Sequence, residues 1–411
     1  MTKYNIRLAM PAIVVVLSVL SAVSADTWRL GQDQDWQAVS TEGKDKFLMA
    51  VVEAKKLVNS GQSEAAREAF DNLKKDFPEI AGSDLDDFIE AEMLFCEGKL
   101  KKAADAYDKL YTKYPQSKLR QAALDRQFSI GTAFLAGQKK TVLGIFKVAG
   151  FADGAKIMKR ITEHAGDTSI GIEAAVVLAQ KHEERGEFVT AYRIYEKLLT
   201  EHPDNDFRDQ ILEREFAIAT AYLGGQKRQF LRVVKIKGYA YGVKIMEKIT
   251  DRAGIDSQIG LKAALAVAEH YEKRKKFNQA YLKWWEISLQ WQRGKTGRDA
   301  LLGMARCKHA AYNLYPENKR PFYDTSNLSM AKSCYEKFKL LYPKDTEEME
   351  VDEILTEIDE QLAESQLSIG EYYYKTDNIQ SANLYFNMVI SDWPTTKAAE
   401  MAKEMLTGVD K

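Results

Sequence analysis

The side chains best suited to catalysis or metal binding are few in this 411-residue chain and widely separated. Histidine and cysteine come first, because imidazole and thiolate groups act as bases, nucleophiles and metal ligands. They stand at His164, His182, His202, His270, His309, Cys96, Cys307 and Cys334. Their spacing matches no zinc motif, and the chain has no glycine-rich phosphate loop or nucleophile elbow. We therefore expect no catalytic site, no cofactor and no metal, in a protein that is not an enzyme.

Two short segments are unusually aromatic. Their rings are Tyr281, Trp284, Trp285, Trp291, Tyr372, Tyr373 and Tyr374. Successive residues of a helix point about 100° apart, so at least one of three consecutive tyrosines should be exposed or meet a partner. Trp285, Tyr372 and Tyr374 are our candidate partner-binding residues, because exposed aromatic side chains often anchor interfaces. Lateral packing on the adjacent helix is the alternative for each.

Two basic segments are the other candidate binding sites. They fall at roughly 137–150 and 225–238, and their β-branched residues flanked by glycine predict a short extended excursion or hairpin in each. A strand edge that carries basic side chains suits the capture of an extended peptide. The alternative is that these side chains only keep the turns soluble. The candidate binding residues are Lys139, Lys140, Lys227 and Arg228.

The elements that must position these residues repeat along the chain. Alanine, an aromatic residue and proline recur with offsets of four and twelve positions at Ala66–Phe70–Pro78, Ala103–Tyr107–Pro115, Ala191–Tyr195–Pro203, Ala331–Tyr335–Pro343 and Ala382–Phe386–Pro394. Residues four apart share a helical face, and proline ends a helix. A second amphipathic stretch precedes each set, which gives the period of about 34 residues that is typical of tetratricopeptide repeats. We expect an all-α fold, a right-handed superhelical α-solenoid of about eight helix pairs with two short extended insertions.

A longer repeat occupies the centre of the chain. Residues 126–166 align without a gap to 214–254, with 21 of 41 positions identical, and each copy contains one of the basic segments. We therefore expect two helical pairs to have been duplicated. The predicted divisions are a signal peptide at 1–25, a non-repeat segment at 26–44, N-terminal repeats at 45–125, the duplicated block with two insertions at 126–297, and C-terminal repeats at 298–411.

The first residues have the pattern of an export signal. Lys3 and Arg7 precede an apolar run at 12–20, and small residues at 23–25 form a cleavage site. An uncleaved anchor is the alternative, although the run is shorter than the ~20 residues that a spanning helix needs. Without residues 1–25 the formal net charge changes from −1 to −3. This near balance, together with export, argues against nucleic acid as a partner.

The cysteines are too few for a disulfide scaffold. Cys307 and Cys334 lie on neighbouring predicted helices and either pair in an oxidising compartment or remain two buried, reduced thiols. No cysteine follows the predicted cleavage site, so we see no lipid anchor there.

The C-terminal third resembles a known family. Residues 362–373, a short turn and residues 382–398 are similar to the end of the BamD family (also called ComL or YfiO), tetratricopeptide lipoproteins of the outer-membrane β-barrel assembly machinery. Ser368–Tyr373 corresponds to the family's small–acidic–Tyr–Tyr helix. The missing lipid-attachment cysteine is a departure, and it puts in doubt any anchoring of this protein in the outer membrane.

The resemblance implies a protein-binding scaffold in outer-membrane protein assembly. Its C-terminal repeats would dock an assembly partner and its N-terminal repeats would meet client chains. The partners would be other envelope proteins, either β-barrel assembly components or unfolded clients, in the periplasm or at the periplasmic face of the outer membrane. The alternative is a periplasmic tetratricopeptide coordinator of cell division or cell-wall synthesis. An N-terminal coiled coil would favour it, and residues 26–45 show no heptads.

Overall fold

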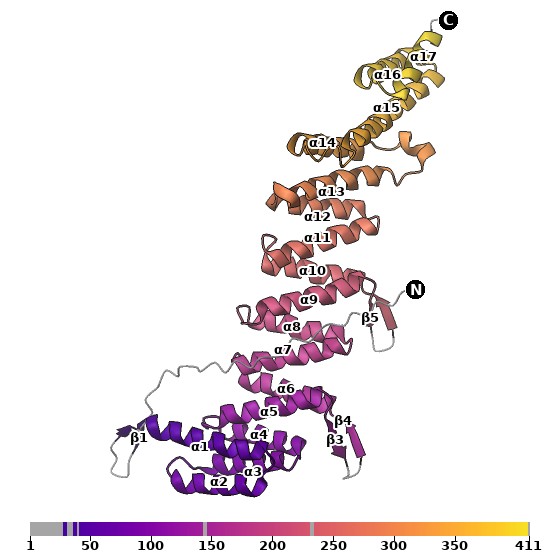
Figure 1. Cartoon of the computed structure of the whole chain (residues 1–411). Helices are drawn as coiled ribbons and strands as arrows, with labels where there is room; N and C mark the ends of the chain where they lie inside the picture. The colour runs from indigo at the N-terminus through magenta and orange to yellow at the C-terminus, as the bar shows by residue number, and fades with distance from the viewer. Residues whose placement is uncertain (1–27, 31–35, 39–40, 143–145, 231–233, 410–411) are drawn as a thin grey trace. The chain divides into compact units, whose positions relative to one another are not determined.

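A computed structural model describes residues 28–30, 36–38, 41–142, 146–230 and 234–409 (Figure 1). The predicted signal at 1–25 lies outside the described residues. The described chain is almost entirely helical, and its strands form two-stranded antiparallel hairpins. The prediction of an all-α solenoid of tetratricopeptide-type helix pairs is confirmed.

The described helices follow one another as eight pairs and a final helix, as expected. The pairs are α1 (Thr41–Asn59) with α2 (Ser63–Asp76), α3 (Ser83–Cys96) with α4 (Leu100–Lys113), α5 (Arg120–Leu135) with α6 (Phe151–Ala165), α7 (Ser169–Glu184) with α8 (Phe188–Glu201), α9 (Arg208–Leu223) with α10 (Tyr239–Ala253), α11 (Gln258–Lys273) with α12 (Phe277–Gln290), α13 (Gly294–Tyr312) with α14 (Ser326–Leu341), and α15 (Val351–Lys375) with α16 (Ile379–Asp392). The last helix is α17 (Lys397–Val409), and a 3₁₀ helix, η1 (Glu317–Phe322), connects α13 to α14.

Five helices end where the proline spacing predicts. Helices α2, α4, α8, α14 and α16 each stop two residues before their proline, and the ring residue between has φ near −130° and ψ between 55° and 72°. Proline disfavours the helical region for the residue before it, which explains this shared departure. The alanine and the aromatic residue of every set are at most 2% exposed. The repeat pattern therefore marks both the helix end and the buried contact between helices.

The two basic segments form hairpins, as predicted. Strand β3 (Lys139–Val142) pairs antiparallel with β4 (Phe146–Ala149), and β5 (Lys227–Phe230) pairs with β6 (Val234–Lys237) (Figure 1). A third hairpin joins β1 (Trp28–Leu30) to β2 (Trp36–Ala38). Each sheet has two strands in the described part of the chain, so each strand there has an outer edge without a partner strand.

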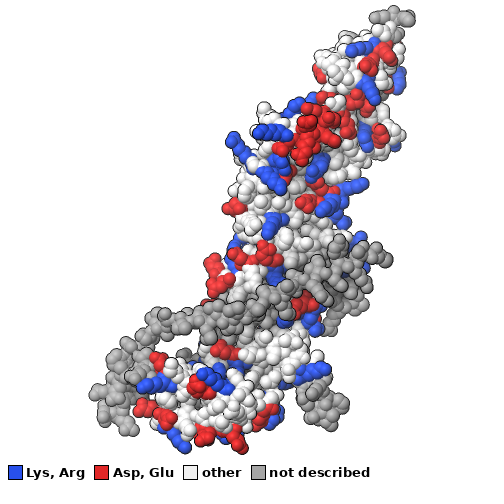
Figure 2. Space-filling model, viewed as in Figure 1, with Lys and Arg blue, Asp and Glu red and all other residues white. Residues whose placement is uncertain are grey.

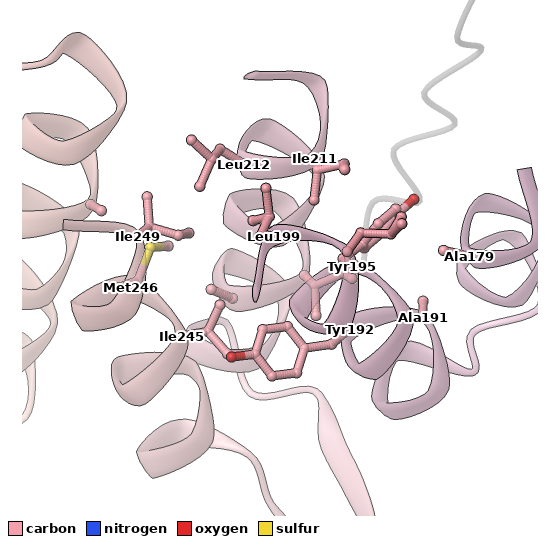
Figure 3. Close-up of a cluster of buried hydrophobic side chains, with 14 of the residues drawn as sticks. Ala179, Ala191, Tyr192, Tyr195, Leu199, Ile211, Leu212, Ile245, Met246 and Ile249 are labelled. Carbon is pink, nitrogen blue, oxygen red and sulfur yellow. The ribbon is translucent and has the colours of Figure 1, made fainter. Parts of the chain in front are cut away.

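The chain divides into two compact units, residues 1–171 and 172–411. In the second unit, side chains of α7 to α11 form one buried cluster, in which Ala179 and Ala191 sit beside Tyr195 while Met246 and Ile249 approach from α10 (Figure 3). The divisions predicted from the sequence repeats stay predictions, because these two units are defined by compact packing and not by repetition. Within the described ranges, no helix combines the length and the apolar character needed to cross a membrane.

The three cysteines are free thiols, which gives a first testable prediction. Cys307 is 1% exposed, and burial raises the pKa of its thiol, as does the neighbouring Glu272. Burial also raises the pKa of Cys334. We expect a maleimide to leave Cys307 unlabelled in the folded protein, because access and thiolate formation are both suppressed. After denaturation, mass spectrometry should count three labelled thiols, whereas one labelled thiol would reveal the Cys307–Cys334 disulfide.

Candidate protein-binding surfaces

A groove lies over α11, α12 and α13 in the second unit. It consists of two adjoining hollows of about 640 and 320 Å³, which share Phe277, Arg306 and Ala310. Leu302 and Leu314 add apolar surface to its lining. Apolar walls with a few fixed polar groups are typical of ligand pockets, so this groove is suited to holding part of another chain.

One ion pair orders the polar centre of this groove. The guanidinium of Arg306 donates to both carboxylate oxygens of Glu272, with Nη2 3.0 Å from Oε1 and 2.9 Å from Oε2. The indole N–H of Trp284 also donates to Glu272. The Arg306 side chain remains 52% exposed. A cation that is already held in place loses little entropy on binding, so Arg306 is prepared to meet a carboxylate or carbonyl of a bound segment.

The tyrosines at the end of α15 divide as their angular spacing predicts. Tyr373 stacks on Tyr385 of α16, with ring centroids 5.6 Å apart and planes 13° from parallel. Tyr372 is 63% exposed and Tyr374 is 37% exposed. Because Tyr373 is held by α16, the two exposed rings project from opposite sides of a packed helix end. We call this end of α15, with Tyr372 and Tyr374, the tyrosine end.

Trp285 lies on a different apolar surface. It is 44% exposed, and it shares one face of α12 with Leu282 and Leu289, which are three residues before it and four after it. The neighbouring Trp284 is buried against α11 and α13. The exposed leucines were not predicted, because apolar residues at helical spacing normally indicate a buried face.

The four basic candidates have different surroundings. Lys139 is exposed in the first unit and Lys227 in the second. Arg228 is half-buried, with its guanidinium carbon 4.3 Å from the centre of the Tyr241 ring. The side chain of Lys140 lies outside the described residues. Within the second unit, neither Lys227 nor Arg228 shares a described contact with the tyrosine end or with Trp285. The roles of all four basic residues in binding stay predictions.

One large exposed side chain was missed from the sequence. Phe322, at the end of η1, is 75% exposed, and Tyr323 beside it stacks on Tyr315 with ring centroids 3.9 Å apart. Pro321 is the sequence feature that could have indicated this exposure. Proline interrupts helical structure, so the residue after it lacks a helical neighbour to pack against.

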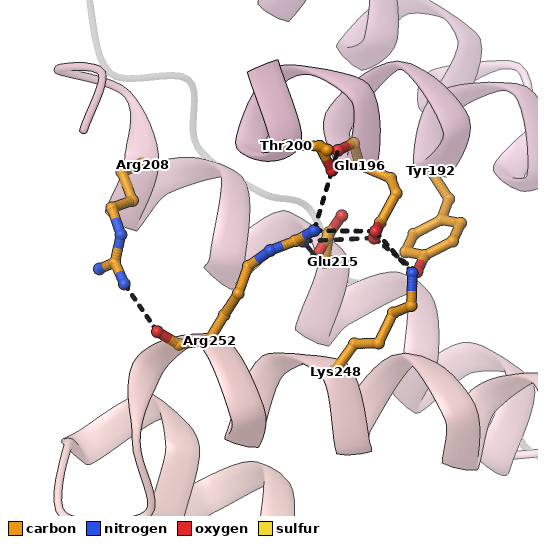
Figure 4. Close-up of polar contacts among 7 residues, drawn as sticks. All are labelled: Tyr192, Glu196, Thr200, Arg208, Glu215, Lys248 and Arg252. Atoms are coloured by element: carbon orange, nitrogen blue, oxygen red, sulfur yellow. Dashed lines mark hydrogen bonds and ion pairs between the residues drawn. The ribbon is translucent and has the colours of Figure 1, made fainter. Parts of the chain in front are cut away.

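An ionic cluster joins α8 to α10 in the second unit, and Arg208 of α9 donates to the carbonyl of Arg252 beside it (Figure 4). Glu196 accepts hydrogen bonds from Lys248 Nζ at 2.6 Å, Arg252 Nη2 at 2.8 Å and the Tyr192 hydroxyl at 2.8 Å. Burial alone would raise the pKa of Glu196, but these hydrogen bonds overcome it and lower the pKa to about 2. The cluster is a packed structural contact and faces no groove that we describe.

Glu215 lies beside this cluster without joining it. Its carboxylate is 0% exposed, and neither oxygen has a hydrogen-bond partner. The Arg252 guanidinium is 4.0 Å away, which is too far for a hydrogen bond. Burial, and then the charge of Glu196, raise the pKa of Glu215 to about 8. Glu215 is therefore mostly protonated at neutral pH.

Acidic side chains gather around the start of α15 (Figure 2). Asp352 and Glu353 lie in the first turn of this helix, where negative charge interacts favourably with the helix dipole. These exposed carboxylates therefore belong to a solvated helix start. Among the described residues, no group of His, Cys, Asp and Glu side chains could hold a metal ion.

Comparison with known proteins identifies the repeat. A tetratricopeptide repeat profile matches residues 90–117, which cover the second half of α3, all of α4 and the Tyr107 and Pro115 positions of the spacing. The sequence matches none of the curated proteins with which it was compared.

Several solved structures are similar to this chain at low identity. One is the C-terminal part of a TPR repeat-containing protein from Cytophaga hutchinsonii, with 14% identity, 77% of this chain and 98% of that chain covered, and a TM-score of 0.28. A second is a tetratricopeptide repeat protein from Parabacteroides merdae, with 16% identity, coverages of 79% and 98%, and a TM-score of 0.24. A third is the apo form of the quorum sensor NprR from B. thuringiensis, with 14% identity, coverages of 84% and 86%, and a TM-score of 0.24.

Three observations agree with one another: the profile match, the proline spacing that occurs five times, and the helix pairs. This chain is a protein that contains tetratricopeptide repeats.

Proposed function

We propose that the protein is an exported, non-catalytic scaffold that binds other proteins during outer-membrane protein assembly. Tetratricopeptide repeats imply a scaffold for protein–protein interaction. The narrower role is supported by the resemblance of Ser368–Tyr373 to the small–acidic–Tyr–Tyr helix of the BamD family, and export is supported by the pattern of residues 1–25. The observation that carries the proposal is that Tyr372 and Tyr374 are exposed on a helix end held by the Tyr373–Tyr385 stack.

In this proposal the tyrosine end docks a folded assembly component. Tyrosine combines a large apolar ring with a hydroxyl and has few rotatable bonds, so it loses little conformational entropy when an interface forms. The groove around Arg306 then takes an extended or helical segment of a second protein. Its ordered guanidinium would meet a polar backbone or acidic group, while Phe277 and Leu302 would meet apolar side chains.

The proposal predicts that the tyrosine end decides which proteins are recovered with the chain. The test uses the full chain, purified by an affinity tag from detergent-solubilised envelopes, with the Tyr372→Ser/Tyr374→Ser double variant beside it. We expect a β-barrel assembly component to be recovered with the unchanged protein. Recovery with the double variant should be at least about tenfold lower, because truncating an interface anchor costs about 1–2 kcal/mol or more.

Leu340→Ser is the matched control, since Leu340 is 79% exposed on α14 and belongs to none of the candidate surfaces. It should leave recovery unchanged. If the unchanged protein recovers no β-barrel assembly component, the proposed role is wrong, and recovery of cell-division or cell-wall proteins instead would favour the alternative function. If the double variant recovers as much as the unchanged protein, the tyrosine end is not the docking site.

A further inference from the structure

A second groove lies in the first unit, at the end of the helix pairs that carries the hairpin β3–β4. Its volume is about 950 Å³, at the upper end of the range of small-ligand pockets. Three segments form it: the turn between α3 and α4, the end of α5, and the start of β3. Phe134, which is 1% exposed, gives it an apolar wall.

Two tight turns shape this groove. Gly98 in the first turn has φ of 72°, and Gly137 before β3 has φ of 108°, a backbone region that other residues rarely adopt. A Cβ atom at either position would meet nothing within 4 Å, so the backbone angle and not crowding is what calls for glycine. The turns bring the start of α4 close to the start of β3, although the two are separated by an entire helix in sequence.

The lining of the groove is strongly basic. Lys99, Lys101, Lys102 and Lys139 line it together with one carboxylate, Glu97, and all four lysines are exposed. Glu97 lies 2.6 Å from Lys99 Nζ, and Lys101 Nζ lies 3.6 Å from Asp153 Oδ1. Neither Lys102 nor Lys139 has an ion-pair partner among the described residues. As far as the described residues go, the groove therefore holds positive charge without a neutralising partner, which favours an acidic occupant.

The strand edge at the end of the groove favours an extended occupant. Lys139 is the first residue of β3, which pairs with β4 on one side and has no strand on the other within the described residues. An extended segment that adds to such an edge gains main-chain hydrogen bonds, and its side chains alternate between the two faces of the sheet. A segment lying in the groove could thus continue along β3 without changing conformation.

The internal duplication supplies a natural comparison. The offset that aligns 126–166 with 214–254, continued toward the N-terminus, places α4 against α8. The residues in place of Lys99, Lys101 and Lys102 are then Glu187, Val189 and Thr190. The second copy keeps its hairpin and a basic residue, Lys227, in place of Lys139. The two copies therefore have the same backbone arrangement with different charge.

From this arrangement we propose that the groove between the α3–α4 turn and β3 binds an extended, acidic segment of another protein, which adds to the outer edge of β3 while its carboxylates meet Lys101, Lys102 and Lys139. The site is separate from the tyrosine end. It does not depend on the role in outer-membrane assembly, and a binding measurement with purified protein tests it alone.

The experiment measures fluorescence anisotropy of a labelled eight-residue peptide in which glutamate alternates with valine. We expect saturable binding to the full chain that weakens as salt rises, because surface charges are screened. A peptide with lysine in place of glutamate should bind at least about tenfold more weakly, since like charges oppose one another. N-methylation of alternate residues should also weaken binding, because it removes the main-chain donors that pair with β3.

The decisive variant is Lys101→Val/Lys102→Thr, which installs the residues of the second copy and is therefore compatible with this backbone. We expect about tenfold weaker binding, because the variant loses two partly screened ion pairs and the contacts that accompany them. Lys295→Val/Lys319→Thr removes the same charge from exposed positions in the second unit and should change affinity by less than about twofold. Circular dichroism confirms that each variant is folded.

Three results would overturn the proposal. Equal binding by the Lys101→Val/Lys102→Thr variant and the unchanged chain would exclude this groove as the site. Equal affinity for the acidic and the basic peptide would exclude charge recognition. Binding to vesicles that contain phosphatidylglycerol, without binding to the acidic peptide, would assign the lysines to a membrane surface instead of a protein segment.

Discussion

Replacing Glu215 with glutamine should make the second unit more stable at pH 8.5 and leave its stability at pH 5 nearly unchanged. The carboxyl of Glu215 is buried without a hydrogen bond, and burial raises its pKa to about 8. In the unfolded chain the same group titrates near its ordinary value of about 4.3. The folded state therefore binds more protons than the unfolded state between these two pH values, and stability falls as pH rises through that window.

The size of this effect follows from the width of the window. A pKa shift of this size corresponds to roughly 3–5 kcal/mol in the free energy of unfolding. This stabilisation is present in full below about pH 4 and is lost by about pH 8. Glu196 has the opposite sign, because its pKa of about 2 lies below the ordinary value. Its contribution is lost only as pH falls below about 4 toward 2, outside the window of the experiment. We expect Glu215→Gln to gain roughly 2–4 kcal/mol at pH 8.5.

The first copy of the duplicated block provides the reciprocal control. Gln127 occupies the position of Glu215 and is also 0% exposed. Its Nε2 donates to the carbonyl of Ala104 at 2.6 Å, and its Oε1 accepts from the Tyr111 hydroxyl at 2.5 Å. An amide therefore fits this site without a charge. Gln127→Glu should destabilise the first unit by a similar amount at pH 8.5, and lowering the pH to 5 should restore most of the loss.

Urea unfolding at the two pH values, with hydrogen exchange to separate the two units, measures both variants. Solenoid units need not unfold in one step, so the exchange of α5 and of α9 is compared helix by helix. A Glu215→Gln protein that is less stable than the unchanged chain at pH 8.5 would contradict the assignment. So would a gain that is equally large at pH 5, since a protonated carboxyl and an amide should then behave alike.

The second large effect is expected from Arg126→Ala in the first unit. The Glu92 carboxylate is 0% exposed, and it accepts from Arg126 Nη2 at 2.7 Å and from the Tyr107 hydroxyl at 2.8 Å. Arg126 also donates to Asn59 Oδ1 and packs over the ring of Phe95. The cluster thus ties α5 to α1, α3 and α4. Without Arg126, Glu92 remains as a buried charge with no hydrogen-bonded cation, a loss that costs about 3–5 kcal/mol.

Arg214→Ala is the matched control for this loss. Arg214 aligns with Arg126, but its Nη1 lies 3.7 Å from Glu183 Oε1 and its side chain is 47% exposed. We expect a cost below about 1 kcal/mol, because exposed ion pairs contribute little. Chemical denaturation of the two variants compares the effects directly, and an equal loss in both would show that burial of Glu92 is not the deciding factor.

The fold follows closely from short-range patterns. The proline spacing predicted where α2, α4, α8, α14 and α16 end, since proline acts on its immediate neighbour. The β-branched segments flanked by glycine predicted the hairpins β3–β4 and β5–β6, because strand preference and turn formation also depend on neighbouring residues. These features depend on a few adjacent residues, and local sequence is sufficient to recognise them.

The binding sites could be predicted from the sequence less completely, because they consist of residues that folding brings together from separate segments. The lysines of β3 were identified from sequence, but Lys99, Lys101 and Lys102 were not, since only the turns at Gly98 and Gly137 bring them beside Lys139. Buried polar residues such as Gln127 and Glu215 were also missed, because a polar residue gives no apolar signal. The sequence alignment of the two copies contained a usable signal, because a neutral glutamine in the first copy aligns with a glutamate in the second.

The central proposal is that the tyrosine end docks an envelope assembly partner, and photo-crosslinking in living cells tests it most directly. A photoreactive phenylalanine analogue replaces Tyr372, which is 63% exposed, in the full-length chain. The same analogue at Leu340 on α14, which is 79% exposed, serves as the control position. We predict one dominant crosslinked product at position 372, containing a β-barrel assembly component, and none of that product at position 340. Crosslinks from position 372 only to cytoplasmic proteins, or the same product from both positions, would contradict the proposal.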